Sequence, residues 1–355
     1  MTSRGDMEKS FQCGKNPLAT VLFTLHHITM SDKMIRLPDT DKSVPKHMVV
    51  GYMHYINFKP FKEGGVAKLE VCYDKNLCRE VLMKRLHPHL RDNAMEQARF
   101  LREARVTAQI QHPTSVPVYE LGRDDKGDLY FTMKKLEGRD LRDVIHALRD
   151  GDPATETDFT LPRLLDVFIQ VCQGIAYAHH HGVIHRDLKP ANILIGEFFE
   201  VMVLDWGLAK VFSEPEEADV FPTMNRTGGG DMVELTQAGR RYGTPLYMSP
   251  EQADGITDVD ERCDIYNLGL ILYEILTYQG LIDGEDINEV IDKVKNQSPM
   301  PPSERAPERE IPRELENICM QALQKTPGRR YKSVLGMADA VQRYLDATSH
   351  KINFL

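Results

Sequence analysis

The sequence predicts an α+β fold in which a small sheet-rich region is followed by a larger helical region. Two observations support this prediction. Residues 49–138 contain several short β-rich stretches with one helix, whereas residues 139–350 are dominated by apolar residues at helical spacing. Residues 1–48 show little periodicity and are predicted to form a poorly ordered extension, and residues 351–355 a short tail.

Three stretches of the small region carry the β-branched and apolar residues that strands favour. They are Val66–Tyr73, Glu80–Leu86 and Leu129–Met133. Met95–Ile110 has helical spacing instead, with an apolar face formed by Phe100, Leu101, Ala104 and Ala108. We therefore expect a small sheet accompanied by one helix.

The large region is expected to contain long helices. Apolar residues at the spacing i, i+3, i+4, i+7 predict a strongly amphipathic helix from Leu161. Pro162 would fall in its first turn, where proline is tolerated. Its apolar face consists of Leu161, Leu164, Leu165, Phe168, Val171, Cys172 and Ile175. Ile265–Leu276 is apolar nearly all round, which predicts a helix buried in the middle of this region. Gly151–Thr160 is rich in acids and turn formers and is expected to be a loop.

Composition excludes several classes of protein. The net charge of −9 argues against a nucleic-acid or acidic-membrane binder, and the excess of acids beyond Asp140 favours basic peptide partners. No apolar run reaches the roughly 18 residues that span a bilayer, so membrane insertion is not expected. The short apolar run Leu18–Leu25 follows acidic residues and lacks a small-residue cleavage site, which argues against a signal peptide.

The six cysteines are scattered without a C-x-x-C pair, so a zinc site or a disulfide framework is not expected. This usage fits a reducing cytoplasm. His179-His180-His181 ends a helical pattern, and we interpret these histidines as solvated or packed residues instead of metal ligands.

The stretch His185–Asn192 combines the side chains that phosphoryl transfer requires. Asp187 can accept a hydroxyl proton, Lys189 can neutralise a phosphate, and Asn192 can hold a magnesium ion. After an apolar run, Asp205 follows as a second metal-ligand candidate at a strand end. A charged loop without this function would need every spacing to arise by chance, so we interpret the segment as a catalytic loop.

From about Tyr55 to Leu345 the chain resembles the eukaryotic-type serine/threonine protein kinases, particularly their bacterial branch. Nine motifs occur in the order of that family: a degenerate glycine loop at Glu63-Gly64-Gly65, Val81-Leu82-Met83-Lys84, Glu103, the catalytic loop, Asp205-Trp206-Gly207, Gly243-Thr244-Pro245, Ser249-Pro250-Glu251, Asp264 and Arg330. Single motifs of this kind are weak, but nine in order are specific. The resemblance implies a bilobal protein-kinase-like fold with a small β-rich N-lobe and a large helical C-lobe.

The resemblance also implies roles at the phosphoryl-transfer centre, with ATP as the donor. Lys84 would hold the α- and β-phosphates and would be kept in place by an ion pair with Glu103. Asp187 would orient and deprotonate the substrate hydroxyl, and Lys189 would steady the γ-phosphate.

Asn192 and Asp205 would bind Mg²⁺ through their oxygen atoms. Trp206 replaces the usual phenylalanine beside the metal aspartate, and a bulky aromatic ring can still pack there. Three further residues match structural positions of the family, an ion pair that braces the large lobe and an anchor for the catalytic loop: Glu251, Arg330 and Asp264.

The nucleotide positions implied by the resemblance are Lys62, Gly64, Gly65, Ala67, Leu69, Leu82, Lys84, Met133, Lys135 and Leu194. Lys62 and Ala67 stand where the family has the first and third glycines of its loop. Leu82 replaces an alanine expected against the adenine ring, a change that commonly costs about 1–3 kcal/mol in a close-packed pocket. We therefore expect weaker or altered nucleotide affinity with the transfer chemistry retained.

Substrate class follows from residues near the catalytic loop. Lys189 and Gly243-Thr244 resemble the pattern of serine/threonine kinases, so protein serine and threonine hydroxyls are the expected acceptors. The segment Asp205–Glu251 is long and rich in glycine, and it also contains Ser213, Thr223, Thr227 and Thr236. A phosphate on Thr236 is expected to pair with Arg186 and to order this segment.

Two other functions remain open at this stage. The changed residues Lys62, Ala67 and Leu82 leave room for a pseudokinase, a nucleotide-binding or scaffolding protein on the same fold. A small-molecule kinase of the aminoglycoside phosphotransferase type shares the two lobes, but such enzymes lack the Ser-Pro-Glu segment that binds peptide substrates. The presence of Ser249-Pro250-Glu251 therefore argues against that alternative.

Overall fold

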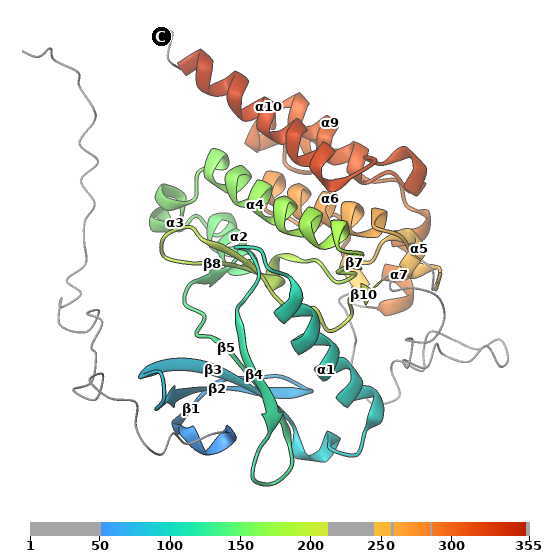
Figure 1. Ribbon diagram of the computed structural model, residues 1–355. Helices are drawn as coiled ribbons and strands as arrows, with labels where there is room; N and C mark the ends of the chain where they lie inside the picture. The colour runs from blue at the N-terminus through green and yellow to red at the C-terminus, as the bar shows by residue number, and fades with distance from the viewer. Residues whose placement is uncertain (1–50, 212–244, 257–258, 285, 353–355) are drawn as a thin grey trace, which may run out of the picture. The chain divides into compact units, whose positions relative to one another are not determined.

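The computed structural model describes residues 51–211, 245–256, 259–284 and 286–352, which belong to a unit formed by residues 48–355. Figure 1 shows a sheet and helix α1 at one end of this unit and a group of helices at the other. We call residues 51–136 the small lobe and residues 139–352 the large lobe. The predicted α+β, bilobal fold is confirmed.

The sheet of the small lobe is antiparallel, with the strand order β1-β2-β3-β5-β4. Its strands are β1 (Tyr55–Glu63), β2 (Ala67–Asp74), β3 (Arg79–Leu86), β4 (Val118–Arg123) and β5 (Leu129–Lys134). β2, β3 and β5 match the three predicted stretches. The sequence did not indicate β1 and β4, because polar residues interrupt the apolar ones in these two edge strands, and only Tyr55 among their residues is buried.

Helix α1 (Ala94–Gln109) starts where the Asn93 side chain accepts hydrogen bonds from the backbone of the first turn. Phe100 packs against Phe131 of the sheet, with the ring centroids 5.1 Å apart. Ala108 was predicted on the same face but is exposed. The end of the helix turns its other side inward, since Val106 belongs to the core of the large lobe.

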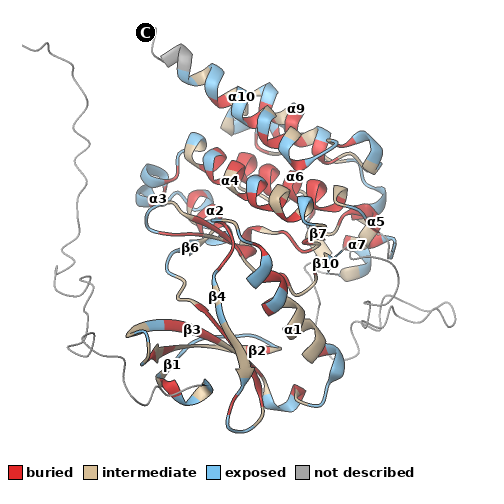
Figure 2. Ribbon diagram, viewed as in Figure 1, coloured by how far each residue is buried: buried red, intermediate tan, exposed pale blue. Residues whose placement is uncertain are grey.

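The helices of the large lobe are α2 (Leu141–Arg149), α3 (Pro153–Asp158), α4 (Leu161–His180), α5 (Pro250–Ala253), α6 (Arg262–Thr277), α7 (Ile287–Asn296), α8 (Pro302–Arg305), α9 (Arg313–Ala322) and α10 (Val334–Ile352). Every residue of α6 from Cys263 to Thr277 is buried, which confirms the predicted central helix (Figure 2). Helix α4 packs against both α6 and α10.

The predicted loop Gly151–Thr160 contains helix α3, so this prediction was wrong. Asp152 caps the helix by accepting a hydrogen bond from the backbone N–H of Thr155 at 2.9 Å, and Pro153 occupies the first turn. An aspartate followed by proline occurs both in turns and at the start of helices. Here the helix forms, and its residue Thr155 is buried against the large lobe.

The described part of the large lobe also contains five short strands that pair with one another. They are β6 (Arg139–Asp140), β7 (Val183–Ile184), β8 (Ile193–Ile195), β9 (Val201–Val203) and β10 (Lys210–Val211). β9 also pairs with the segment that joins α1 to β4, since Ser115 forms a parallel bridge with Val203. The backbone N–H of Val203 donates to the Thr114 carbonyl at 2.8 Å.

The same connecting segment lies directly against helix α4. A Cβ atom on Gly174 of α4 would lie 2.0 Å from Thr114 Oγ1, so a glycine is needed for this close approach. Thr114 Oγ1 is itself held at 2.8 Å by His112 Nδ1.

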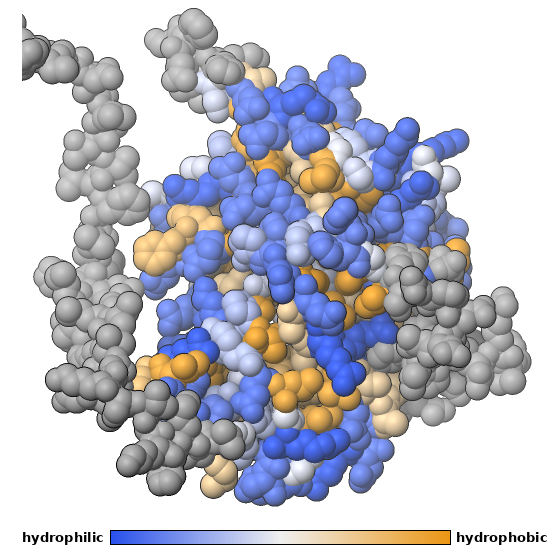
Figure 3. All heavy atoms as spheres, in the orientation of Figure 1, coloured by the Kyte–Doolittle hydropathy of each residue, from blue (hydrophilic) through white to orange (hydrophobic). Residues whose placement is uncertain are grey.

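Most of the described surface visible in Figure 3 is hydrophilic. Among the described residues, the structure has no helix of the length and apolarity that crossing a membrane requires.

Candidate active site

A cavity of about 360 Å³ lies between the glycine loop (residues 62–67), helix α1 and the catalytic loop. It falls in the size range of small-molecule sites. Its walls are formed by Lys62, Glu63, Gly64, Gly65, Val66, Ala67, Leu69, Lys84, Glu103, Thr107, Val116, Phe131, Met133, Leu136, Ala191, Asn192, Val203, Leu204, Asp205 and Trp206.

Lys84 of β3 and Glu103 of α1 form the ion pair that the sequence predicted. Lys84 Nζ donates to Glu103 Oε1 and Oε2 at 2.5 and 2.6 Å. Burial alone would lower the pKa of Lys84, but the carboxylates of Glu103 and Asp205 outweigh burial and raise it. The amine is therefore a fixed positive charge in the cavity wall.

The catalytic loop is suspended from helix α6 by a buried carboxylate. Asp264 accepts hydrogen bonds from the backbone N–H groups of His185 and Arg186, each at 2.9 Å, and a third at 2.7 Å from His179 Nε2. Burial would raise the pKa of Asp264, but the bond from His179 and nearby positive charge lower it. Arg186 has a φ of 69°, a strained backbone that this anchoring holds in place.

Asp187 is almost fully buried and is joined to the two other predicted residues of its loop. Lys189 Nζ donates to Asp187 Oδ2 at 2.6 Å, and Asn192 Nδ2 donates to the Asp187 carbonyl at 2.9 Å. The second bond leaves Asn192 Oδ1, at the cavity wall, as an acceptor for a cation. Burial raises the pKa of Asp187 even though Lys189 opposes it, which makes this carboxylate a better proton acceptor.

Asp205 lines the cavity and has a φ of 65°. Burial would raise its pKa, but Lys84 and other positive groups outweigh burial and lower it, so the side chain is a carboxylate. The Trp206 ring lies against His185, with ring centroids 4.6 Å apart and the planes tilted by 54°. The side chain is buried in the core of the large lobe, so the bulky aromatic ring predicted as tolerable does pack there. Its Nε1 has no hydrogen-bond partner in the described part of the chain.

Asn192 and Asp205 present two oxygen donors to the same cavity, and such oxygen donors are what magnesium prefers. Within the described ranges no group of three or more histidine, cysteine or acidic side chains could hold a metal by itself. Mg²⁺ bound here would therefore take its remaining ligands from phosphate and water. His179, part of the histidine tract, is committed to Asp264.

Some predicted nucleotide residues have other surroundings. Leu82, Lys135 and Leu194 are not among the residues that line the cavity. Leu82 is fully buried in the core of the small lobe, and Lys135 pairs with Glu80 at 2.7 Å and Glu137 at 2.9 Å. Their contact with a nucleotide stays a prediction.

Other cavity residues were not predicted as site residues, although Glu63 and Ala191 belong to two of the motifs. They are Glu63, Val66, Thr107, Val116, Phe131, Leu136, Ala191, Val203 and Leu204. Most are apolar, and an apolar residue beside a cavity has the same sequence pattern as one in a core. For Leu136, the position two residues after the end of β5 and two before the break at Gly138 was a signal that could have indicated it.

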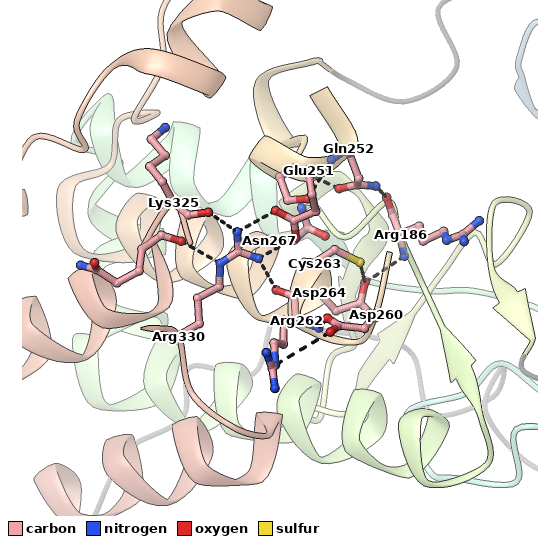
Figure 4. A network of polar contacts seen from close by, with 12 residues as sticks. Arg186, Glu251, Gln252, Asp260, Arg262, Cys263, Asp264, Asn267, Lys325 and Arg330 are labelled. Atoms are coloured by element: carbon pink, nitrogen blue, oxygen red, sulfur yellow. Dashed lines mark hydrogen bonds and ion pairs between the residues drawn. The ribbon is translucent and has the colours of Figure 1, made fainter. Parts of the chain in front are cut away.

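Arg330 and Glu251 form the predicted brace of the large lobe, shown in Figure 4. Arg330 donates to both Glu251 oxygens at 2.7 Å. Its remaining N–H groups donate to the carbonyls of Gln324, Arg262 and Lys325, so each of the five guanidinium hydrogens has an acceptor. These hydrogen bonds offset the desolvation of the buried guanidinium, and loss of either partner would leave an uncompensated charge.

A second buried acid of the large lobe was not predicted. Glu274 of α6 accepts a hydrogen bond from Tyr247, in the segment before α5. Burial raises the pKa of Glu274 to about 7, against the effect of Tyr247.

Gly243, Thr244 and the candidate phosphorylation site Thr236 lie outside the described residues, as do Ser213, Thr223 and Thr227. The pairing of a Thr236 phosphate with Arg186 therefore stays a prediction. Mass spectrometry that finds no phosphate between Asp205 and Glu251 of active protein would contradict it.

Comparisons with known proteins agree with this geometry. The family described as "Protein kinase domain" matches residues 56–343. The chain is 34% identical to serine/threonine-protein kinase PknD of Protochlamydia amoebophila over 299 residues, or 83% of this chain. It is 35% identical to PknD of Chlamydia caviae over 290 residues (81% of the chain) and to PknD of Chlamydia trachomatis serovar D over 296 residues (80%). The aligned part is 30% of the length of each relative.

Proposed function

We propose that this chain, which belongs to the protein kinase family, transfers the γ-phosphoryl group of ATP to serine and threonine hydroxyls of proteins. The observation that carries the proposal is the convergence on one cavity of Lys84 from the small lobe with Asn192 and Asp205 from the large lobe. Pseudokinases commonly lose the catalytic-loop aspartate, the metal aspartate or the β-strand lysine, and the presence of Asp187, Asp205 and Lys84 in this sequence argues against that alternative.

The proposed mechanism relies on positioning and charge, because phosphoryl transfer needs little covalent chemistry from the protein. Lys84, held by Glu103, neutralises and orients the α- and β-phosphates. Asp187 orients the acceptor hydroxyl and takes its proton as the oxygen attacks the γ-phosphorus. Lys189, now paired with Asp187, is within reach to balance the negative charge of the transferred group.

Asn192 and Asp205 are proposed to hold Mg²⁺, which when bound neutralises the charge of the phosphates. The low pKa of Asp205 supports this role, because the carboxylate stays ionised and available to a cation near neutral pH. Lys62, Gly64, Gly65, Ala67, Leu69 and Met133 are proposed to contact the nucleotide from the small lobe.

The acceptor class is supported by Lys189 and by the similar proteins described above, which are named serine/threonine-protein kinases. We also propose a cytoplasmic location. Among the described residues, Cys72, Cys78, Cys172, Cys263 and Cys319 are free thiols, which fits a reducing compartment.

Transfer of labelled phosphate from magnesium ATP to a generic basic protein substrate tests the proposal. Asp187→Asn should reduce incorporation at least a hundredfold, since it removes the proton acceptor. Asp339→Asn, an exposed change on α10, is the matched control and should retain full transfer.

Two outcomes would contradict the proposal. Equal incorporation by the wild-type and Asp187→Asn proteins would mean that another group performs the chemistry. Thermal stabilisation by magnesium ATP without any transfer to protein would support a nucleotide-binding scaffold instead.

A further inference from the structure

The side chain of His87 reaches the tip of the glycine loop from the end of β3. His87 Nε2 lies 2.7 Å from the carbonyl oxygen of Gly64, and the backbone N–H of His87 donates to the Val66 carbonyl at 3.0 Å. A carbonyl oxygen can only accept, so Nε2 carries the proton of the first bond. The loop tip is therefore held at two carbonyl groups by one residue outside the loop.

The local sequence fixes the direction of this side chain. Pro88 restricts the preceding residue to extended backbone, and His87 has φ −62° and ψ 138°. The His89 ring stacks on the His87 ring, with the centroids 5.4 Å apart and an angle of 21° between the planes. The His87 side chain is mostly buried, with 12% of its surface exposed. Its hydrogen bond is thus held in place from two sides.

The bond to Gly64 also sets the orientation of the next N–H group. In a trans peptide the C=O and N–H groups point in opposite directions. Because the Gly64 carbonyl points to His87, the N–H of Gly65 points away from it. Gly65 lines the cavity and His87 does not.

We propose that His87 is a positioning residue that turns the Gly64–Gly65 peptide so that the Gly65 N–H is presented to the nucleotide phosphates. The inference rests on the proposed ATP-dependent function. Two adjacent glycines give this peptide little intrinsic preference, and a flipped peptide would place a carbonyl oxygen beside phosphate. Lys62 and Ala67 replace the outer glycines of the family pattern, so the loop keeps its freedom mainly at the tip that His87 holds.

Two substitutions separate the hydrogen bond from the ring. His87→Phe keeps a ring that can stack on His89 but removes the donor, whereas His87→Gln loses the ring and keeps an amide donor. His87→Ala takes the place of His87→Phe if that variant does not fold. His180→Phe, at an exposed position of α4, is the matched control.

The dissociation constant of magnesium ATP can be followed by the fluorescence of Trp206, which is the one tryptophan of the sequence and lines the cavity. His87→Phe should raise this constant, and KM for ATP, about 5-fold, the equivalent of one hydrogen bond of ~1 kcal/mol. KM for the peptide should not change. His87→Gln should return the constant to within about 2-fold of the wild type.

An unchanged constant in His87→Phe, or an equal rise in His87→Gln, would overturn the inference while wild-type binding still supports the proposed function. Failure of the wild-type chain to bind magnesium ATP would overturn both. Equal losses of melting temperature in the two variants without a change in affinity would assign His87 a purely structural role.

Discussion

Replacing Glu274 by glutamine should make the protein more stable at neutral pH than in its natural form. Glu274 is buried in helix α6, where Tyr247 donates one hydrogen bond, and among the described residues no positive group offsets its burial. Burial therefore favours the protonated acid and raises its pKa from 4.5 to about 7. Glutamine has nearly the same shape and can still accept the bond from Tyr247.

The raised pKa determines the sign of the pH dependence. Between pH 4.5 and 7 the folded protein keeps a proton on Glu274 that the unfolded chain has released. The stability that this proton provides is complete below pH 4.5 and is lost as the pH rises through 7. A shift of this size corresponds to about 3 kcal/mol, of which about 2–3 kcal/mol is lost between pH 5 and pH 8.

Denaturant unfolding at pH 5, 6, 7 and 8 would measure this effect. The free energy of unfolding of Glu274→Gln, taken relative to wild type, should rise by about 2–3 kcal/mol across this range. Glu314→Gln, an exposed change on α9, should run parallel to wild type. Parallel curves for Glu274→Gln as well would refute the reasoning, because they would mean that Glu274 is already ionised in the folded protein at pH 5.

Three further changes test other parts of the structure. Gly174→Ala would place a methyl group 2.0 Å from the Thr114 oxygen, so it should lower the free energy of unfolding by about 1–3 kcal/mol in a denaturant titration. Gly336→Ala is the control: the nearest side-chain atom would be 3.6 Å away, and the change should raise the free energy of unfolding by up to ~1 kcal/mol. Similar values for both would contradict the packing argument. Arg330→Ala should lower the free energy of unfolding by about 3–5 kcal/mol, because it leaves the buried carboxylate of Glu251 without its partner. The control Arg343→Ala, at an exposed position, should lower it by less than ~1 kcal/mol, and an equally small loss in Arg330→Ala would show that the pair is dispensable. Asp205→Asn should remove the Mg²⁺ dependence of ATP binding followed by tryptophan fluorescence, and an unchanged dependence would place the cation elsewhere.

The residues of the catalytic loop could be predicted from the sequence, because their chemistry requires particular residue types at short, fixed spacing. Asp187, Lys189 and Asn192 occupy one loop, and the structure joins them by direct hydrogen bonds. The pairing of Lys84 with Glu103 was accessible for a different reason. An isolated lysine and glutamate carry little information, but their order relative to the catalytic loop is specific.

Features that depend on tertiary packing were not accessible. Strands β1 and β4 lack an apolar pattern because they lie at the sheet edges, and α3 depends on the burial of Thr155. The raised pKa of Glu274 arises from neighbours far along the chain, so an ordinary glutamate in the sequence gave no sign of it. His87 was missed because a single histidine after a strand matches no motif.

The attachment of the segment 112–115 to both β9 and α4 has a consequence for movement between the lobes. This segment belongs to the small lobe by sequence, yet its bond to Val203 and its contact with Gly174 make it part of the large lobe mechanically. Any tilt of the sheet relative to the large lobe would therefore turn about this segment, because its contacts hold it to β9 and α4.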